Sequence, residues 1–278
     1  MNSLVIFGLL AVLMLTGMPI SISLGLTVLT FLFTMTQVPL ESVALKLFTG
    51  IEKFEIMAIP FFILAGNFLT HGGVARRMIQ FATAMVGHWY GGLGLGGVLA
   101  CALFAAVSGS SPATVVAIGS ILMPAMVKAG FPKSFGAGVI TTSGALGILI
   151  PPSIVMVMYS VSTNTSVGAL FMAGVVPGLL LAFLLGLTTW YRAKKFDYPR
   201  QPKASWGQRW VAFRKAIWGL LLIVVVMGGI YTGIFTPTEA AAMSAVYAFV
   251  VAVFVYKDMG LKDVPRVLLA SANMSAML

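Results

Sequence analysis

Acidic side chains are the scarcest charged groups in this sequence of 278 residues, which contains only 7 Asp and Glu. None of them lies between Ile56 and Phe196, so a proton relay or metal site built from carboxylates is excluded from that part of the chain. The single cysteine, Cys101, excludes a disulfide framework and a cysteine-based metal site. Because it lies in an apolar segment, we interpret it as a small packing residue.

Charged residues of both signs are few, since they make up 9% of the sequence, whereas hydrophobic residues make up 59%. The mean hydropathy of +1.02 is far above that of ordinary soluble domains. Several apolar runs approach the ~20 residues that a helix needs to cross a bilayer. The composition therefore predicts a single all-α, polytopic membrane domain over residues 1–278. The first apolar run has no basic n-region or clear cleavage site, so we expect a retained span rather than a signal peptide.

The net charge of +10 would suggest nucleic acid in a soluble protein, but here the position of the charges matters more than their sum. Most Lys and Arg residues lie in four clusters, which the positive-inside rule places in the cytoplasm. Counting spans back from these clusters predicts an N-terminus outside the cell membrane, and no nucleic-acid partner. The clusters are Arg76–Arg77, Lys128–Lys133, Arg192–Lys215 and Lys257–Arg266.

The apolar runs and basic clusters together predict the order of the segments. We expect two N-terminal spans, an interfacial arm helix, a span that ends at a basic cluster, a re-entrant hairpin region, a broken helix, a further span, a cytoplasmic basic loop, two spans and a last apolar segment. In that order, the segments cover residues 1–37, 38–54, 55–77, 78–129, 133–161, 167–196, 197–215, 216–256 and 257–278.

A polar break interrupts one apolar stretch at Ser108-Gly109-Ser110-Ser111-Pro112-Ala113-Thr114. Backbone that leaves the helical conformation inside a bilayer must be satisfied by protein or must line a cavity. Ser110 or Ser111 is placed to cap a helix that has Pro112 in its first turn. The pattern favours a re-entrant helical hairpin with this break at its tip. Two complete spans joined by an external turn remain the alternative, and the charge count does not separate the two.

A second break follows at Gly144-Ala145-Leu146-Gly147-Ile148-Leu149-Ile150-Pro151-Pro152-Ser153, in the middle of the next apolar run. Two successive prolines remove two backbone donors, which frees carbonyl oxygens around Gly147 to Ile150. Either proline can then open a second half-helix. A proline kink that serves only packing is the alternative reading. Two breaks in neighbouring segments are typical of the ion and substrate sites of secondary transporters.

Neutral oxygens dominate between these breaks, which predicts a site for Na⁺ as the coupling ion rather than for protons. The half-helix N-termini carry positive dipole ends and favour an anionic substrate. The candidate hydroxyl ligands belong to Ser108, Ser110, Ser111, Thr114, Thr141, Thr142 and Ser143.

Four motifs, in this order, resemble the large membrane subunit of the TRAP (tripartite ATP-independent periplasmic) transporters, the DctM type. They are Ile59-Pro60-Phe61-Phe62-Ile63-Leu64-Ala65-Gly66-Asn67, the Ser-Gly-Ser-Ser-Pro-Ala-Thr tip, the Gly-Ile-Leu-Ile-Pro-Pro-Ser break, and Thr236-Pro237-Thr238-Glu239-Ala240-Ala241-Ala242. The resemblance covers essentially the whole chain.

The resemblance implies an elevator-type fold like that of the ion-transporter superfamily, in the bacterial inner membrane with a periplasmic N-terminus. It implies a sodium gradient as driving force, no organic cofactor, and an organic-acid substrate such as a C4-dicarboxylate or a sialic acid. It also implies two partners, a small membrane subunit (DctQ type) and a periplasmic binding protein (DctP type), beside the membrane lipid. We expect the chain to hold the first inverted repeat and the start of the second, and thus to be a fragment.

The resemblance further implies a sodium and substrate site formed by the hairpin tip and the broken helix, with a symmetric partner site in the second repeat. It carries over to two sets of residues: Ser108, Gly109, Ser110, Ser111, Pro112, Ala113 and Thr114 at the tip, and Gly144, Gly147, Ile150, Pro151, Pro152 and Ser153 at the broken helix, to which the neutral-oxygen pattern adds Thr141, Thr142 and Ser143.

Other patterns carry plainer readings. Thr236 and Glu239 form a capping box around Pro237, which we favour over a proton-coupling role for Glu239. The glycines from Gly92 to Gly97 match G-x-G-x-x-G without a strand before them, so we expect close helix packing instead of dinucleotide binding. His71 and His88 lie near segment ends, which argues against a Ser/His protease, and no enzyme is predicted. A binding-protein-independent anion permease, a channel and a structural subunit remain open.

Overall fold

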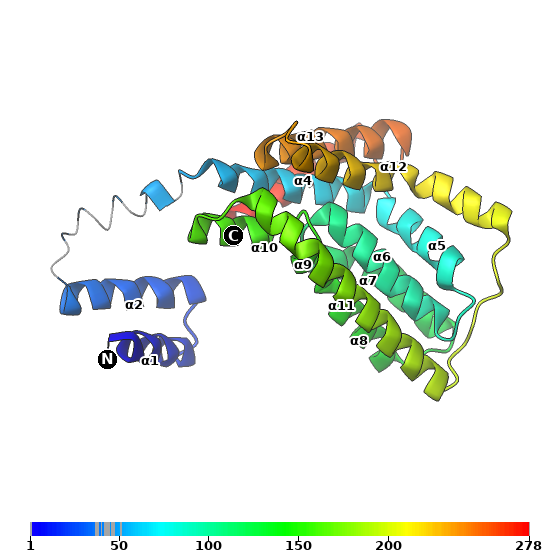
Figure 1. Ribbon diagram of the computed structural model, residues 1–278, viewed down its shortest axis with the longest axis horizontal. Coiled ribbons are helices and arrows are strands. Elements are labelled where there is room, and N and C mark those ends of the chain that lie inside the picture. Colours follow the sequence, from blue (N-terminus) through cyan, green and yellow to red (C-terminus); the bar gives the residue numbers. More distant parts are fainter. Residues whose placement is uncertain are drawn as a thin grey trace. The chain divides into compact units, whose positions relative to one another are not determined.

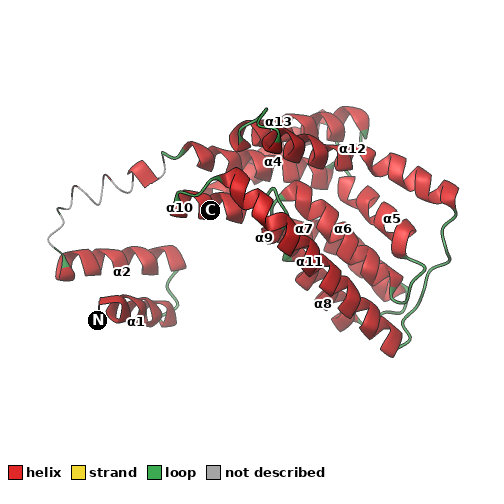
Figure 2. Ribbon diagram, in the orientation of Figure 1, coloured by secondary structure: helices red, strands yellow, loops and turns green. Residues whose placement is uncertain are grey.

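The computed structural model describes residues 2–36, 39, 41, 45, 48–50 and 52–277, and every regular element in these residues is a helix (Figures 1 and 2). Five of the described helices are long and apolar enough to cross a membrane, and six if one bent pair counts as a span. These helices confirm the predicted all-α polytopic membrane fold. The chain divides into two compact units, Met1–Lys53 and Phe54–Leu278.

The first unit contains two short apolar helices, α1 (Asn2–Leu15) and α2 (Ile20–Met35). Gly17 turns the chain between them with φ +80°, a value that glycine adopts without strain. At 14 and 16 residues, both helices are shorter than the ~20 residues of a typical span. Much of the predicted arm helix over residues 38–54, including Leu40, Val43, Ala44 and Leu47, lies outside the described residues.

The second unit begins with a group of helices packed around α4. Phe68 of α4 makes an edge-to-face contact with Phe249 of α13 at 5.5 Å between ring centroids. Asn67, also on α4, donates to the Ser271 hydroxyl of α14 at 2.8 Å. These elements are η1 (Phe54–Met57), α4 (Ala58–His71), α12 (Trp206–Tyr231), α13 (Pro237–Val250), the π-helix η2 (Val251–Val255), η3 (Leu261–Asp263) and α14 (Val264–Met277).

The segment 78–129, expected to be one hairpin region, contains the end of a separate helix and then a hairpin. α5 (Val74–Val86) is followed by a loop, and the hairpin consists of α6 (Gly92–Ser108) and α7 (Ser111–Lys128). α5 is amphipathic and more polar than the two helices of the hairpin. The average hydropathy of residues 78–129 does not reveal this difference. The hairpin therefore starts fourteen positions later than expected, at Gly92.

The glycines of α6 let its neighbours approach closely, as expected for small residues at helix contacts. A Cβ atom at Gly96 would lie 2.9 Å from the Thr83 hydroxyl of α5. A Cβ atom at Gly94 would lie 3.1 Å from a methyl group of Thr189 on α11. The run from Gly92 to Gly97 is thus explained by packing.

The following segment is a broken helix beside an unbroken one. α8 (Lys133–Gly144) and the single turn α9 (Leu146–Leu149) are bent by 42° relative to α10 (Ile154–Thr163). α11 (Val167–Lys195) then runs for 29 residues without interruption. Its Ser166 cap accepts a hydrogen bond from the Ala169 amide at 3.4 Å.

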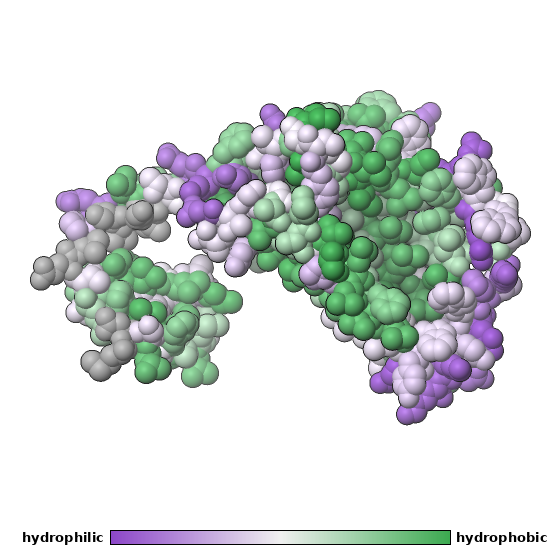
Figure 3. Space-filling model, in the orientation of Figure 1, coloured by the Kyte–Doolittle hydropathy of each residue, from purple (hydrophilic) through white to green (hydrophobic). Residues whose placement is uncertain are grey.

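Aromatic contacts join several basic loops at one end of the second unit. Tyr198 packs edge-to-face on Phe131 and Phe135, with ring centroids 5.6 Å and 4.7 Å away. The Gln201 amide donates to the Gly87 carbonyl at 3.0 Å. The loops after α5, α7 and α11 therefore meet, and Figure 3 shows hydrophilic residues gathered at that end below an apolar face.

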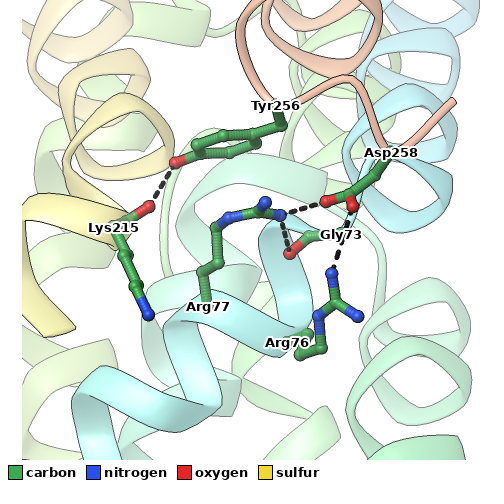
Figure 4. A network of polar contacts seen from close by, with 6 residues as sticks. All are labelled: Gly73, Arg76, Arg77, Lys215, Tyr256 and Asp258. Atoms are coloured by element: carbon green, nitrogen blue, oxygen red, sulfur yellow. Dashed lines mark hydrogen bonds and ion pairs between the residues drawn. The ribbon is translucent and has the colours of Figure 1, made fainter.

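Two other basic residues, Arg76 and Arg77, lie in what we call the Asp258 cluster, formed by Gly73, Arg76, Arg77, Tyr256 and Asp258 (Figure 4). Both arginines pair with Asp258, and Arg77 also donates to the Gly73 carbonyl at 3.0 Å. The Arg77 guanidinium lies 3.8 Å from the centroid of the Tyr256 ring. Burial raises the pKa of Tyr256, while Arg77 opposes the shift, so the hydroxyl stays protonated. It donates to a backbone carbonyl of α12, at Lys215, at 2.6 Å.

The Asp258 cluster generates a matched pair of variants. Arg77→Gln removes a side chain that is only 16% exposed and takes part in several contacts, so we expect a loss of about 1–3 kcal/mol in unfolding free energy. Arg76→Gln removes an ion-pair partner that is 54% exposed, for which about 0–1 kcal/mol is expected. Thermal unfolding of the detergent-purified protein measures both. Equal effects of the two substitutions would contradict the assigned role of Arg77.

Candidate functional site

The tip between α6 and α7 is a two-residue turn whose residue types follow from backbone geometry. Gly109 has φ +61°, in the left-handed region where a side chain is strained. Ser110 is extended and caps α7, since its hydroxyl accepts a hydrogen bond from the Ala113 amide at 3.5 Å. Pro112 occupies the first turn of α7, where its missing N–H does no harm. Of the two expected caps, the structure assigns the role to Ser110.

The break in the next helix lies over Ile150, Pro151, Pro152 and Ser153, none of which is in a helix. α10 starts at Ile154 with Ser153 as its extended N-cap residue. The expectation that a proline opens the second half-helix is therefore wrong, because the two prolines precede the cap. They still donate nothing to the carbonyls four residues earlier.

The tip and the break are in direct contact. The first amide of α10, that of Ile154, donates to the Gly109 carbonyl at 3.0 Å. A Cβ atom at Gly109 would lie 2.8 Å from the Pro152 carbonyl oxygen. On the other side, a Cβ atom at Gly147 would lie 2.8 Å from the Ser111 amide nitrogen. Glycine is thus required at both contacts, and the tip lies in the gap of the broken helix.

The position of this contact along α11 indicates its depth. Cβ atoms at Gly174 and Gly178 would meet the Leu149 carbonyl and the Ile150 side chain. At 1.5 Å per residue, Gly178 is about 17 Å from the start of α11 and about 26 Å from its end. The tip therefore lies beside the interior of a long apolar helix. This position favours a re-entrant hairpin over two complete spans.

Buried hydroxyl groups gather at this contact. Ser108 and Thr114 are fully buried, and their hydroxyl oxygens are 3.0 Å apart. The Thr114 hydroxyl also donates to the Ser110 carbonyl at 2.8 Å. In the described part of the chain, the buried hydroxyls of Ser111, Ser143 and Ser153 have no hydrogen-bond partner.

Such groups are costly to bury, because an unsatisfied hydroxyl loses its hydrogen bonds to water without replacement. Ser111 belongs to the tip, and Ser153 follows the prolines of the break. Ser143 precedes Gly144, which packs on Val115 of α7. The three hydroxyls therefore belong to the segments that form the contact between hairpin and broken helix, and a bound cation or water would satisfy them.

Not every predicted residue faces this contact. Thr141 and Thr142 are exposed on α8, and the Thr142 hydroxyl donates to the Gly138 carbonyl of its own helix at 2.7 Å. Pro112 is exposed too, while Ala113 and Ile150 are partly buried. The structure thus removes Thr141 and Thr142 from the hydroxyls that converge. Helical periodicity places Ser143 on the face opposite its two neighbours.

α4 contributes a wall that the sequence reasoning did not assign to the site. A Cβ atom at Gly66 would lie 3.3 Å from both the Cα and the Cβ atom of Ser108. The next residue, Asn67, holds Ser271 of α14 through its amide group. Gly66 lies in the motif from Ile59 to Asn67, so a glycine within an apolar helix was the available signal.

The hairpin and the broken helix contribute no carboxylate to this contact, since residues 56–196 contain no Asp or Glu. Asp258 is paired with Arg76 and Arg77, and Glu239 is engaged at the start of α13. Among the described residues, no group of three or more His, Cys, Asp or Glu side chains is placed to hold a metal ion. The contact therefore offers neutral oxygens, which suit a monovalent cation better than a divalent one, and helix N-termini, which favour an anion.

The predicted capping box at Thr236 and Glu239 is present. The Thr236 amide and hydroxyl both donate to the Glu239 carboxylate at 2.8 Å. In return, the Thr236 hydroxyl accepts a hydrogen bond from the Glu239 amide at 3.3 Å. Glu239 therefore has a structural role at the N-terminus of α13, where the helix dipole favours its negative charge.

The chain matches a protein-family model over residues 7–278, described as the tripartite ATP-independent periplasmic transporter, DctM component. The chain therefore belongs to the DctM family. It is a multi-pass membrane protein, and this family consists of transporter components rather than enzymes.

Curated relatives agree with this assignment. The chain is 78% identical to the C4-dicarboxylate TRAP transporter large permease protein DctM of Rhodobacter capsulatus, over 100% of this chain and 66% of the relative. It is 54% identical to the protein of the same name from Pseudomonas aeruginosa, over 92% of this chain and 60% of the relative. The isethionate TRAP transporter permease protein DctMQ of Oleidesulfovibrio alaskensis is 42% identical over 98% of this chain and 43% of the relative. The chain thus spans less than two thirds of their length.

The contact between tip and break predicts different outcomes for two glycines of the broken helix region. Gly147→Ala forces a methyl group against the Ser111 backbone, for which we expect a loss of about 1–3 kcal/mol in unfolding free energy. The control is Gly138→Ala on α8, where a Cβ atom would meet nothing within 4 Å. Thermal unfolding in detergent should show the loss for Gly147→Ala alone. A Gly147→Ala protein as stable as the control would contradict the close contact.

The capping box predicts that charge at Glu239 is dispensable. Glutamine at this position keeps the reciprocal hydrogen bonds of the box but loses the charge that the helix dipole favours, so Glu239→Gln should lower stability only slightly and leave uptake by the full-length parent protein unchanged. Thr236→Ala should cost about 1 kcal/mol of unfolding free energy through loss of the cap. Uptake measured over a range of pH separates the roles, since a proton-coupling carboxyl would make Glu239→Gln inactive.

Proposed function

We propose that this chain acts in the large membrane subunit of a sodium-coupled, binding-protein-dependent secondary transporter that imports organic acids. The observation that carries the proposal is the set of partnerless buried hydroxyls of Ser111, Ser143 and Ser153 between hairpin tip and broken helix. Membership in the DctM family supports the transporter class.

The chemistry of the contact supports Na⁺ as the coupling ion. Hydroxyls and backbone carbonyls at the contact are hard oxygen donors without net charge, which suffice for a monovalent cation. Ser111 and Ser153 supply hydroxyls from the two sides of the contact, so one ion between them would bridge tip and break. Binding would then stabilise the two elements as one body, as the proposed elevator movement requires.

Two helix N-termini at the contact support an anionic substrate. α7 starts at Ser111 and α10 at Ile154, and the positive ends of both helix dipoles point toward the tip. The relatives that are 78% and 54% identical to this chain are named for C4-dicarboxylates. We therefore propose a C4-dicarboxylate or a related carboxylate as the substrate class.

The proposed complex has three kinds of protein. The family description names a tripartite, periplasmic transporter, which supports a periplasmic binding protein (DctP type) as the donor of substrate and a small membrane subunit (DctQ type) as a companion. The location we propose is the bacterial inner membrane, with a periplasmic N-terminus. Residues of the parent protein beyond this chain would supply the second repeat and a second ion site.

Uptake into proteoliposomes tests the proposal. The full-length parent protein, its small subunit and its binding protein should accumulate the dicarboxylate only with an inward Na⁺ gradient. Ser111→Ala should lower the Na⁺ affinity roughly tenfold, because one buried oxygen is lost. Ser120→Ala is the control, since Ser120 is exposed on the same helix and bonded to the Ala117 carbonyl.

Two results would contradict the proposal. Undiminished uptake when choline replaces Na⁺ would exclude sodium coupling. Undiminished uptake without the binding protein would favour the alternative, a binding-protein-independent anion permease that uses the same broken-helix construction.

A further inference from the structure

A hollow lies between α6 and α11. It has a volume of about 730 Å³, within the range of small-molecule sites. Its walls are apolar, with Val98, Leu99 and Ala102 from α6, and Phe183 and Leu187 from α11. Phe183 and Leu187 are exposed, so the hollow opens sideways on the apolar surface that faces lipid. We call it the α6–α11 groove.

Aromatic and basic residues form one end of the α6–α11 groove. This mouth contains His88, Trp89 and Tyr90 from the loop after α5, Trp190 from α11, and Arg200. The hydrogen bond from Gln201 to Gly87 described above ties the basic loop to the mouth. Trp and Tyr side chains collect where a bilayer meets water. The mouth therefore lies at the interface, and the rest of the groove extends toward the hydrocarbon.

The mouth has unused capacity to bind an anion. The Arg200 guanidinium is stacked 3.5 Å above the Tyr90 ring, and no ion pair of Arg200 occurs in the described residues. The buried Nδ1 atom of His88 has no hydrogen-bond partner within the described part of the chain. The Lys194 ammonium adds positive charge 5.2 Å from the Trp190 ring. The residues that line the groove include no carboxylate to neutralise this charge.

The dimensions of the groove fit a lipid acyl chain better than a free anion. Its lining extends from Leu95 to Ala102 on α6 and from Ala182 to Trp190 on α11. At 1.5 Å per residue, each wall is about 10–12 Å long, and it runs along the helices away from the mouth. A charged mouth at the interface joined to an apolar slot along the helix axes matches the headgroup and acyl chain of a phospholipid.

We propose that the α6–α11 groove binds one anionic phospholipid, with its phosphate at Arg200 and His88 and an acyl chain between Leu99 and Phe183. Because α6 is one arm of the re-entrant hairpin, the lipid would contact the element that carries Ser108. The proposal does not depend on which ion or substrate the transporter uses.

Lipid binding to the delipidated, detergent-purified full-length parent protein with its small subunit tests the proposal. Native mass spectrometry and thermal unfolding should show saturable binding of phosphatidylglycerol, with a preference over phosphatidylcholine of the same acyl chains. Arg200→Gln should weaken phosphatidylglycerol binding at least fivefold. The control Lys203→Gln, in the same exposed loop but outside the groove, should not.

A second variant and a soluble probe complete the experiment. Ala102→Trp fills the apolar slot and should abolish binding of both lipids, and glycerol phosphate should not compete at concentrations where phosphatidylglycerol binds. Equal affinity for the two lipids, equal effects of Arg200→Gln and Lys203→Gln, or competition by glycerol phosphate would overturn the proposal. Unchanged lipid binding in Ala102→Trp would also overturn it, since the lipid would then bind outside the groove.

Discussion

The hydrogen bond from the Ile154 amide to the Gly109 carbonyl is the contact on which the site depends. It joins the tip of a hairpin to the gap in a broken helix, two places where backbone groups leave helical pairing inside a membrane. The broken helix supplies what the tip lacks, because a donor of α10 satisfies an acceptor of the tip. The close approach requires glycine at Gly109 and Gly147, where a Cβ atom would collide with backbone.

The same contact concentrates polar groups in an apolar setting. Ser108 and Thr114 satisfy each other, whereas Ser111, Ser143 and Ser153 are buried with no partner among the described residues. Partnerless hydroxyls in a packed interior destabilise the fold unless something binds them. A cation that does so would stabilise hairpin and broken helix together, which would couple ion binding to the integrity of this contact.

Local rules were enough to predict the two breaks and to narrow the cap of α7 to Ser110 or Ser111, but they misplaced the start of the second half-helix. Gly109, Pro112 and the Pro151–Pro152 pair act within one or two turns, so their effects are visible in sequence. The capping box of Thr236 and Glu239 is equally local. The all-α membrane fold followed from composition, because few charges and long apolar runs leave little other choice.

Contacts between residues far apart in the sequence could not be predicted from such local rules. Gly66 meets Ser108 across 42 positions of the chain, and Arg77 meets Asp258 across 181. The hydroxyls of Thr141 and Thr142 looked equivalent to that of Ser143 until the packing of α8 decided which face is buried. The α6–α11 groove likewise depends on how two distant helices meet.

The most direct test of a sodium site between the hairpin tip and the broken helix is Na⁺ binding in the absence of substrate. We would measure thermal unfolding of the purified full-length parent protein during a titration with NaCl, with choline chloride keeping the ionic strength constant. The account predicts a saturable rise in Tm for Na⁺ but not for choline, and a smaller rise in Ser153→Ala than in a control, Ser162→Ala, whose exposed hydroxyl bonds to its own helix. An identical response of both variants, or no response specific to Na⁺, would contradict it.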